Sequence, residues 1–159
     1  MKTVCAQIEA RILERLRLEL GLDAVVVGFR ESAAEGTVKS VSGGLPEVRV
    51  TVSPGQSEGY SSPVMEYAAK VAVNLDLEDD PSTASFDAVS AVVERLVERW
   101  NMNEFREETA ALFDTDGFRC SGFRADGGTD SLDLSRENPR VCTVYAFMVK
   151  GVVKQNARS

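Results

Sequence analysis

The sequence predicts an α+β fold: a single domain with a mixed, mainly antiparallel β-sheet, packed by two main α-helices and one short helix. Two periodicities predict this class. Apolar residues that alternate with polar ones place one set of side chains in a core and the other set outward, as in a β-strand. Apolar residues spaced three and four apart form the stripe of an amphipathic helix. Because 159 residues suit one domain with a sizeable core, the domain is expected to span residues 1–159.

Four segments carry the strand pattern and two carry the helical pattern. The core strands are expected at residues 47–53, 65–77, 118–124 and 141–149. The main helices are expected at residues 3–20 and 84–100, with a short helix at about 103–113. Further expected segments are a strand at 24–29, loops at 31–46 and 54–63, a glycine-rich turn at 125–130, a short strand at 131–134 and a flexible tail at 154–159.

The strand at 65–77 and the helix at 84–100 organise the rest of the chain. This strand is longer than most, since strands usually run to roughly 3–10 residues. Either it bends, or its first half projects with 47–53 as a long β-hairpin arm that needs a partner to cover its edge. Both faces of 141–149 are largely apolar, which indicates a central position in the sheet. The side chains expected to be buried are Leu75, Phe86, Val93, Leu96 and Phe147.

Composition and charge exclude several classes of function. The net charge of −7 repels phosphate backbones, so sequence-specific nucleic-acid binding is not expected. The chain has no histidine, which removes Ser-His-Asp and Cys-His nucleophile systems. Its three cysteines have no CxxC spacing and indicate free thiols in a reducing cytoplasm. No apolar run approaches the length that spans a membrane.

One cluster of acidic residues invites a metal-site hypothesis. Asp76, Glu78, Asp79 and Asp80 end the long strand and precede the helix at 84–100. Carboxylate oxygens are suitable ligands for magnesium or calcium. The simpler interpretation is a solvated strand end with negative charge at a helix N-terminus, where the helix dipole favours it. With no other catalytic signature, the chain is expected not to be an enzyme and to hold no cofactor.

Several local patterns, taken in order, resemble those of bacteriophage tail-terminator proteins, the minor tail proteins that cap the tail tube. The resemblance covers roughly residues 47–153. The residues that carry it are Val73-Asn74-Leu75-Asp76-Leu77, Asp79-Asp80-Pro81-Ser82, Phe86-Asp87, Trp100-Asn101, Gly117-Phe118, Gly122-Phe123, and Val144 to Val149 leading into Lys150-Gly151-Val152.

The resemblance implies a structural subunit that assembles as a hexameric ring on the tail. Its partners would be the tail tube protein and a head-completion protein. Its location would be the virion tail, and the cytoplasm of the bacterial host during assembly. The side chains expected to contact a neighbouring subunit or the tail are Tyr60, Glu66, Lys70, Asp76, Glu78, Asp79 and Asp80.

Two alternatives from other classes stay open on the sequence. The first is an acidic metal-dependent enzyme acting on a small molecule through the cluster from Asp76 to Asp80. The second is a monomeric protein-binding module whose binding edge is the hairpin at 47–77. Oligomeric state separates the ring subunit from both alternatives, and metal-dependent thermal stabilisation separates the enzyme from the other two.

Overall fold

The computed structural model describes residues 3–31, 44–57, 64–77, 83–133 and 139–154. Its strands form one five-stranded sheet in the order β1-β2-β3-β5-β4. β1 is parallel to β2, and every other neighbouring pair is antiparallel. The predicted α+β class with a mixed, mainly antiparallel sheet is therefore confirmed. The elements in chain order are α1 (Val4–Leu20), β1 (Val25–Gly28), β2 (Glu47–Ser57), β3 (Val64–Asp76), α3 (Ala84–Trp100), the 3-10 helix η1 (Asn103–Phe105), α4 (Arg106–Phe113), β4 (Phe118–Asp133) and β5 (Arg140–Val153).

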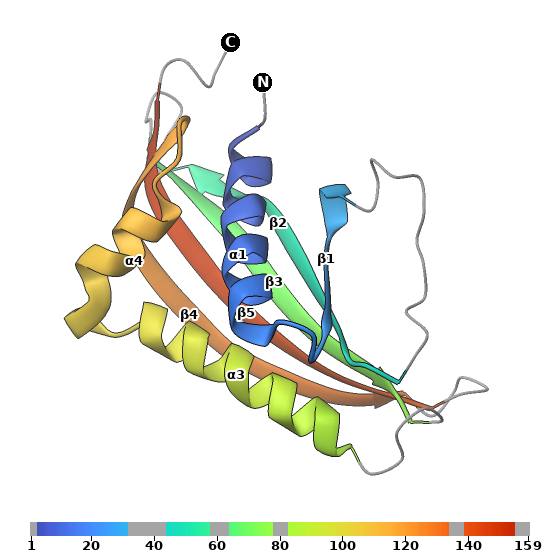
Figure 1. Ribbon diagram of the computed structural model, residues 1–159. Helices are drawn as coiled ribbons and strands as arrows, with labels where there is room; N and C mark the ends of the chain where they lie inside the picture. The colour runs from blue at the N-terminus through green and yellow to red at the C-terminus, as the bar shows by residue number, and fades with distance from the viewer. Residues whose placement is uncertain (1–2, 32–43, 58–63, 78–82, 134–138, 155–159) are drawn as a thin grey trace.

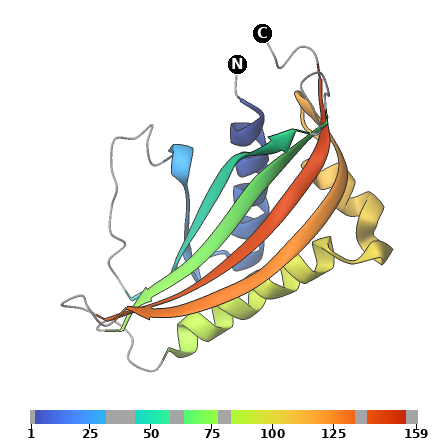
Figure 2. The same ribbon diagram turned by 180° about the vertical axis from the view of Figure 1, so that it is seen from behind.

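The helices form one layer on one face of the sheet (Figure 1). Helix α1 packs on β1 and β2, α3 packs on β3 and β5, and α4 packs on β4. Seen from behind, the strands lie in front of all these helices, and no described helix covers the second face (Figure 2). The described part of the chain thus forms two layers, one of helices and one of strands, and the other face of the sheet is uncovered by described residues.

Local sequence signals set the ends of α1. The Thr3 Oγ1 accepts a hydrogen bond from the Ala6 N–H at 3.2 Å, which satisfies a free donor of the first turn. At the other end Gly21 has a φ of +54°, and its N–H donates to the Arg17 carbonyl. Glycine adopts this conformation without a Cβ penalty, so the helix ends where the sequence predicts.

The core lies between the helical layer and the inner face of the sheet. Alternate residues of β2 and β3 enter it, and α1 covers them with Ile8, Ile12 and Leu16. Under α3 the core is aromatic: the ring of Trp100 lies 5.4 Å from Phe113 and 5.7 Å from Phe147 between centroids, both near edge-to-face. Of the five side chains expected to be buried, Leu75, Val93, Leu96 and Phe147 are.

The prediction that Phe86 is buried is wrong, because its side chain is only partly buried. It belongs to the first turn of α3, where it packs against the margin of the core and also lines a pocket.

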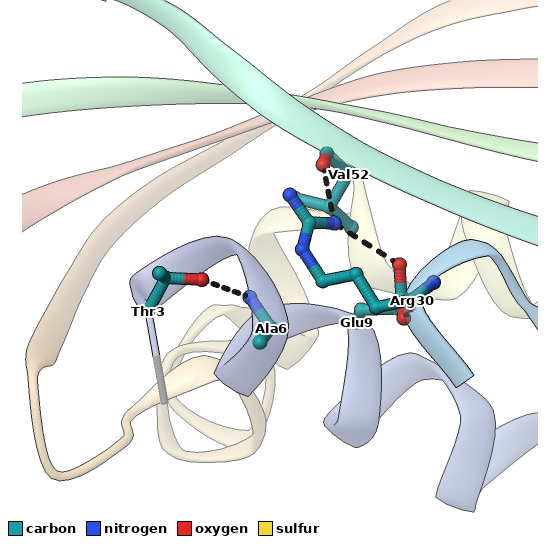
Figure 3. Close-up of polar contacts among 5 residues, drawn as sticks. All are labelled: Thr3, Ala6, Glu9, Arg30 and Val52. Carbon is teal, nitrogen blue, oxygen red and sulfur yellow. Dashed lines mark hydrogen bonds and ion pairs between the residues drawn. The ribbon is translucent and has the colours of Figure 1, made fainter. Parts of the chain in front are cut away.

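A group of hydrogen bonds links α1 to the sheet (Figure 3). The Glu9 side chain is 4% exposed and accepts two hydrogen bonds from Arg30, from the backbone N–H and from Nη1, each at 3.1 Å. The same Nη1 donates to the Val52 carbonyl of β2 at 2.8 Å. Gly28 makes this approach possible, because a Cβ there would lie 2.6 Å from the Leu13 Cδ1.

The expected start of the loop at residue 54 is wrong, because residues 54–57 still belong to a strand. Strand β2 continues through Pro54 to Ser57, with an irregular register against β3 in that stretch. Proline is tolerated at such an irregularity because it has no N–H to leave unpaired. Gly55 is required there, since a Cβ would lie 2.6 Å from the Glu66 carbonyl oxygen. The rest of the expected loop, 58–63, lies outside the described residues, as do 155–159 of the expected tail.

The β2–β3 hairpin is as long as the sequence suggests, but it does not project from the sheet. β5 pairs with β3 along the whole of β3, from Val64 opposite Val152 to Asp76 opposite Arg140. β3 therefore lies inside the sheet, β2 is covered by β1 from Glu47 to Val50, and the long strand bends with the sheet (Figure 2).

The expected turn at 125–130 is wrong. β4 runs without interruption from Phe118 to Asp133 and pairs with β5, with register shifts between Cys120 and Gly122 and between Ala125 and Gly128. Gly127 takes a φ of +88° at the second shift. The two glycines therefore accommodate a β-bulge, which inserts a residue and keeps the strand going.

Candidate interaction surface

The uncovered side of the sheet, called the open face below, is defined by the alternation of the strands. In β3 the buried residues run from Tyr67 to Leu75 at every second position, so the intervening side chains point away from the helices. Residues directly opposite one another on neighbouring strands share a face. The open face therefore comprises Val25 and Val27 of β1, Glu47, Arg49, Thr51 and Ser53 of β2, Val64, Glu66, Ala68, Lys70, Ala72, Asn74 and Asp76 of β3, Arg140, Cys142, Val144, Ala146, Met148, Lys150 and Val152 of β5, and Arg119, Arg124, Thr129 and Ser131 of β4.

The centre of the open face is small and apolar. Ala72 lies opposite Val144, and Ala68 lies opposite Met148. All four side chains are only half-buried, although β3 and β5 each have a neighbouring strand on both sides. Strands β2 and β4, which flank β3 and β5, carry mostly polar residues on this face, such as Thr51 and Thr129, and the short edge strand β1 adds Val25 and Val27. An apolar centre flanked by polar residues is the composition of a protein–protein interface.

The open face is also basic, although the chain as a whole carries −7. Among the side chains that the structure describes, it holds six basic groups against three acidic ones. The basic residues are Arg49, Lys70, Arg119, Arg124, Arg140 and Lys150, and the acidic residues are Glu47, Glu66 and Asp76. Three of the bases have close acidic partners: Arg49 with Glu47, Arg124 with Asp126, and Arg140 with Asp76.

The part of the helical layer formed by α3, η1 and α4 has the opposite balance. These helices together carry six acidic residues and three basic ones. The acidic residues are Asp87, Glu94, Glu98, Glu104, Glu107 and Glu108, and the basic residues are Arg95, Arg99 and Arg106. All of these but Arg99 are exposed. The open face and this α3–α4 surface are thus complementary in charge, whereas α1 carries acids and bases in equal number.

The residues predicted for subunit or tail contact divide into two groups. Glu66, Lys70 and Asp76 all lie on the open face, and Lys70 is exposed. Lys70 and Lys150 both point outward, away from the helices. Tyr60, Glu78, Asp79 and Asp80 lie outside the described residues.

Asp76, the described member of the acidic cluster, has an ion-pair partner. Its Oδ1 accepts a hydrogen bond from the Arg140 Nε at 3.0 Å across the β3–β5 pair. Within the described ranges, no group of three or more cysteine, aspartate or glutamate side chains is placed to hold a metal ion. No helix in that part of the chain is long and apolar enough to cross a membrane.

Comparison with known proteins does not add a family. No protein-family model matches the chain, and no curated protein matches it. The arrangement of the two faces therefore carries the functional argument together with the sequence patterns.

Sequence reasoning missed the open face itself. The apolar second face of 141–149 predicted a central position in the sheet, which β5 has between β3 and β4, but it gave no sign that no described helix would cover that face (Figure 2). A signal was available in the residue sizes: Ala68, Ala72 and Ala146 leave little surface to bury, whereas the inner face of the same strands carries Val71, Val73 and Phe147. The two bases of β4, Arg119 and Arg124, lie within the predicted strand 118–124, but simple alternation puts them on opposite faces; the register shift between Cys120 and Gly122 brings both to the open face.

Proposed function

We propose that this chain is a structural subunit of a bacteriophage or prophage tail, similar in role to tail terminators, which caps the tail tube as a ring and offers a surface for joining the head. The sequence patterns from Val73 to Val152 support this proposal. The element order, with one helix before three strands and another before the final two, is consistent with them.

The observation that carries the proposal is the open face with its half-buried apolar centre. Four strands spaced about 4.8 Å apart and about 40 Å long give this face roughly 700–800 Å². A stable interface buries about 800 Å² on each partner. One face of this sheet is therefore large enough to hold a neighbouring subunit without any further contact.

The charges favour contact between unlike faces. Two open faces brought together would oppose two surfaces that each carry an excess of bases, whereas an open face against the α3–α4 surface opposes an excess of bases with an excess of acids. A contact between two different surfaces repeats from subunit to subunit and closes into a ring when the rotation permits. Like-with-like contact would instead give a closed dimer.

The same arrangement suits a channel that passes DNA. If the open face is covered by the α3–α4 surface of the next subunit, the excess bases of one surface neutralise the excess acids of the other, and the rest of the ring keeps the acidic balance of the chain, which carries −7 per subunit. An acidic channel does not grip the phosphate backbone, so a duplex can move through it. Such a ring would act between the tail tube protein and a head-completion protein, in the virion tail and, during assembly, in the host cytoplasm.

The experiment that tests the proposal uses tails that lack this subunit. Tails assembled without the gene product are incubated with the purified protein, and their lengths are measured by electron microscopy together with their ability to join heads. Saturating protein is expected to stop growth at the normal length and to restore joining. Tails that grow past that length and remain unable to join heads would overturn the proposal.

One alternative is favoured by the same surface. A monomeric protein-binding module would also use an apolar, basic sheet face, with a different protein as its partner. The molar mass of the free chain over a range of concentrations separates the two, because only the ring subunit self-associates. The enzyme alternative gains no support, since Asp76 is paired with Arg140.

A further inference from the structure

A pocket of about 620 Å³ lies between the first turns of α3 and the β4–β5 pair, on the side of the sheet opposite the open face. Helix α3 contributes Asp87, Ser90 and Glu94 to its lining, β4 contributes Asp130, and β5 contributes Tyr145. We propose that this pocket binds an organic cation, an ammonium or guanidinium group carried on an aliphatic stem. The proposal does not depend on the function proposed above.

Charge is the first reason. Three carboxylates line the pocket, and no lysine or arginine is among its described lining residues. The field of these groups reaches the Tyr145 hydroxyl: burial raises the pKa of Tyr145, and Glu94, Asp130 and Glu98 raise it further. A cation placed beside this hydroxyl lies in a negative potential and gains from it, whereas an anion is repelled.

Unsatisfied hydrogen bonding is the second reason. Ser90 is 9% exposed, and its buried Oγ has no hydrogen-bond partner. Such an atom is uncommon in a folded protein, because an unpaired buried hydroxyl costs about 1–3 kcal/mol. The Tyr145 hydroxyl donates to the Ser90 carbonyl at a long 3.3 Å, which leaves its oxygen lone pairs available. A donor-rich group such as an ammonium supplies what these oxygens lack.

A hydrogen bond within the chain fixes the strand side of the pocket. The Asp130 Oδ1 accepts a hydrogen bond from the Thr143 Oγ1 at 2.6 Å, and Thr143 is buried. This contact fixes the Asp130 carboxylate on the strand side, opposite Asp87 and Glu94 on the helix. A cation in the pocket would therefore meet acceptors on two sides.

The shape of the site favours an organic cation over a metal ion. Asp87 and Glu94 are two helical turns apart, and in the described part of the chain no three acidic or thiol groups converge as metal ligands. The remaining wall is apolar and aromatic, with Phe86 and Leu132 beside Tyr145. Aliphatic stems pack on such surfaces, and cations are attracted to aromatic faces.

The test is a titration of the whole chain followed by NMR. The probes are 1,5-diaminopentane, the neutral 1,5-pentanediol of the same length, and a blocked tripeptide with one central lysine. The diamine or the peptide is expected to shift the Tyr145 ring and Ser90 signals, and the diol is expected to shift neither. Tighter binding of the peptide would assign the cation to a protein side chain, and tighter binding of the diamine would assign it to a small molecule.

Two double variants with the same net charge test whether the cation binds in this pocket. Asp87→Asn with Glu94→Gln removes two carboxylates from the pocket, and Glu104→Gln with Glu107→Gln removes two from the surface of η1 and α4. The first variant is expected to weaken binding at least tenfold and the second to leave it within twofold. Equal weakening by both, binding of the diol as tight as that of the diamine, or no shift at Tyr145 in the unaltered chain would overturn the proposal.

Discussion

Arg30 holds the carboxylate of Glu9 by two hydrogen bonds and, through the same Nη1, the carbonyl of Val52. Three elements, α1, the end of β1 and β2, therefore meet at one guanidinium. Replacing Arg30 with methionine leaves Glu9 buried without its cation. Because Arg30 itself is partly exposed, the expected loss in the free energy of unfolding is about 2–4 kcal/mol, below the full cost of breaking a buried pair. Urea denaturation followed by circular dichroism measures it.

The matched control is Glu9→Gln, which keeps the shape and one of the two acceptor oxygens of Glu9 but removes its charge. It is expected to cost clearly less than Arg30→Met, since no unpaired buried charge remains. If the two variants were equally stable, the unpaired carboxylate would not be the cause.

The edge strand β4 depends on side chains rather than on a neighbouring strand for part of its backbone hydrogen bonding. The Cys120 N–H donates to the Asp114 Oδ1 at 2.7 Å, and the Ala125 N–H donates to the Asn101 Oδ1 at 3.1 Å. Asp114→Ala leaves the Cys120 N–H without this acceptor and is expected to cost about 1–3 kcal/mol. Asp114→Asn keeps an acceptor and should retain most of the stability. Thermal denaturation of both variants checks this difference.

The three thiols give a prediction about pH. Burial raises the pKa of Cys120 from 9.0 to about 11, and burial also raises the pKa of Cys5 and of Cys142. In the unfolded chain these thiols ionise near pH 9, whereas the folded chain keeps them protonated, so unfolding releases protons above that pH. Stability is therefore expected to fall as the pH rises from about 9 toward 11.

Alkylation kinetics check the same groups. At pH 8 the native chain should react slowly with iodoacetamide, because the thiolate is the nucleophile and little is formed. All three thiols should react quickly in denaturant. Fast modification of Cys120 in a demonstrably folded sample would contradict its burial.

The sequence predicted those elements whose signals are local. Helix α3 begins and ends where its apolar stripe does, and Gly21 marks the end of α1. The course of β4 was not predictable in this way, because Gly127 and Gly128 are compatible with both a turn and a bulge. Pairing with β5 decides between the two, and that pairing joins residues far apart in the chain.

The candidate interaction surface was likewise predictable only where local alternation determines it. The outward positions of Glu66, Lys70 and Asp76 followed from alternation alone. That Arg140 would pair with Asp76, and that bases of three other strands would gather beside Lys70, depends on the strand order, which alternation does not specify. Glu9 is a similar case, since its partner Arg30 lies beyond β1.

The contact between unlike faces gives the last prediction. Lys70 is exposed near the centre of the open face, and Glu98 is exposed on α3. If the open face of one subunit covers the α3 surface of the next, Lys70→Glu places acid against acid and Glu98→Lys places base against base. Each single variant is therefore expected to weaken self-association about tenfold or more, which sedimentation equilibrium measures.

Mixing the two variants is the sharper measurement. The acidic sheet face of the Lys70→Glu subunit then meets the basic helix of the Glu98→Lys subunit. At the next contact around the ring, the unaltered Lys70 of the Glu98→Lys subunit meets the unaltered Glu98 of the Lys70→Glu subunit. An equimolar mixture should therefore assemble although neither variant does so alone, because both contacts of an alternating ring are favourable. In a contact between two open faces, Glu98→Lys would associate as the unaltered chain does. Unaltered protein that stops tail growth while both variants assemble normally would leave the terminator role in place and refute this interface.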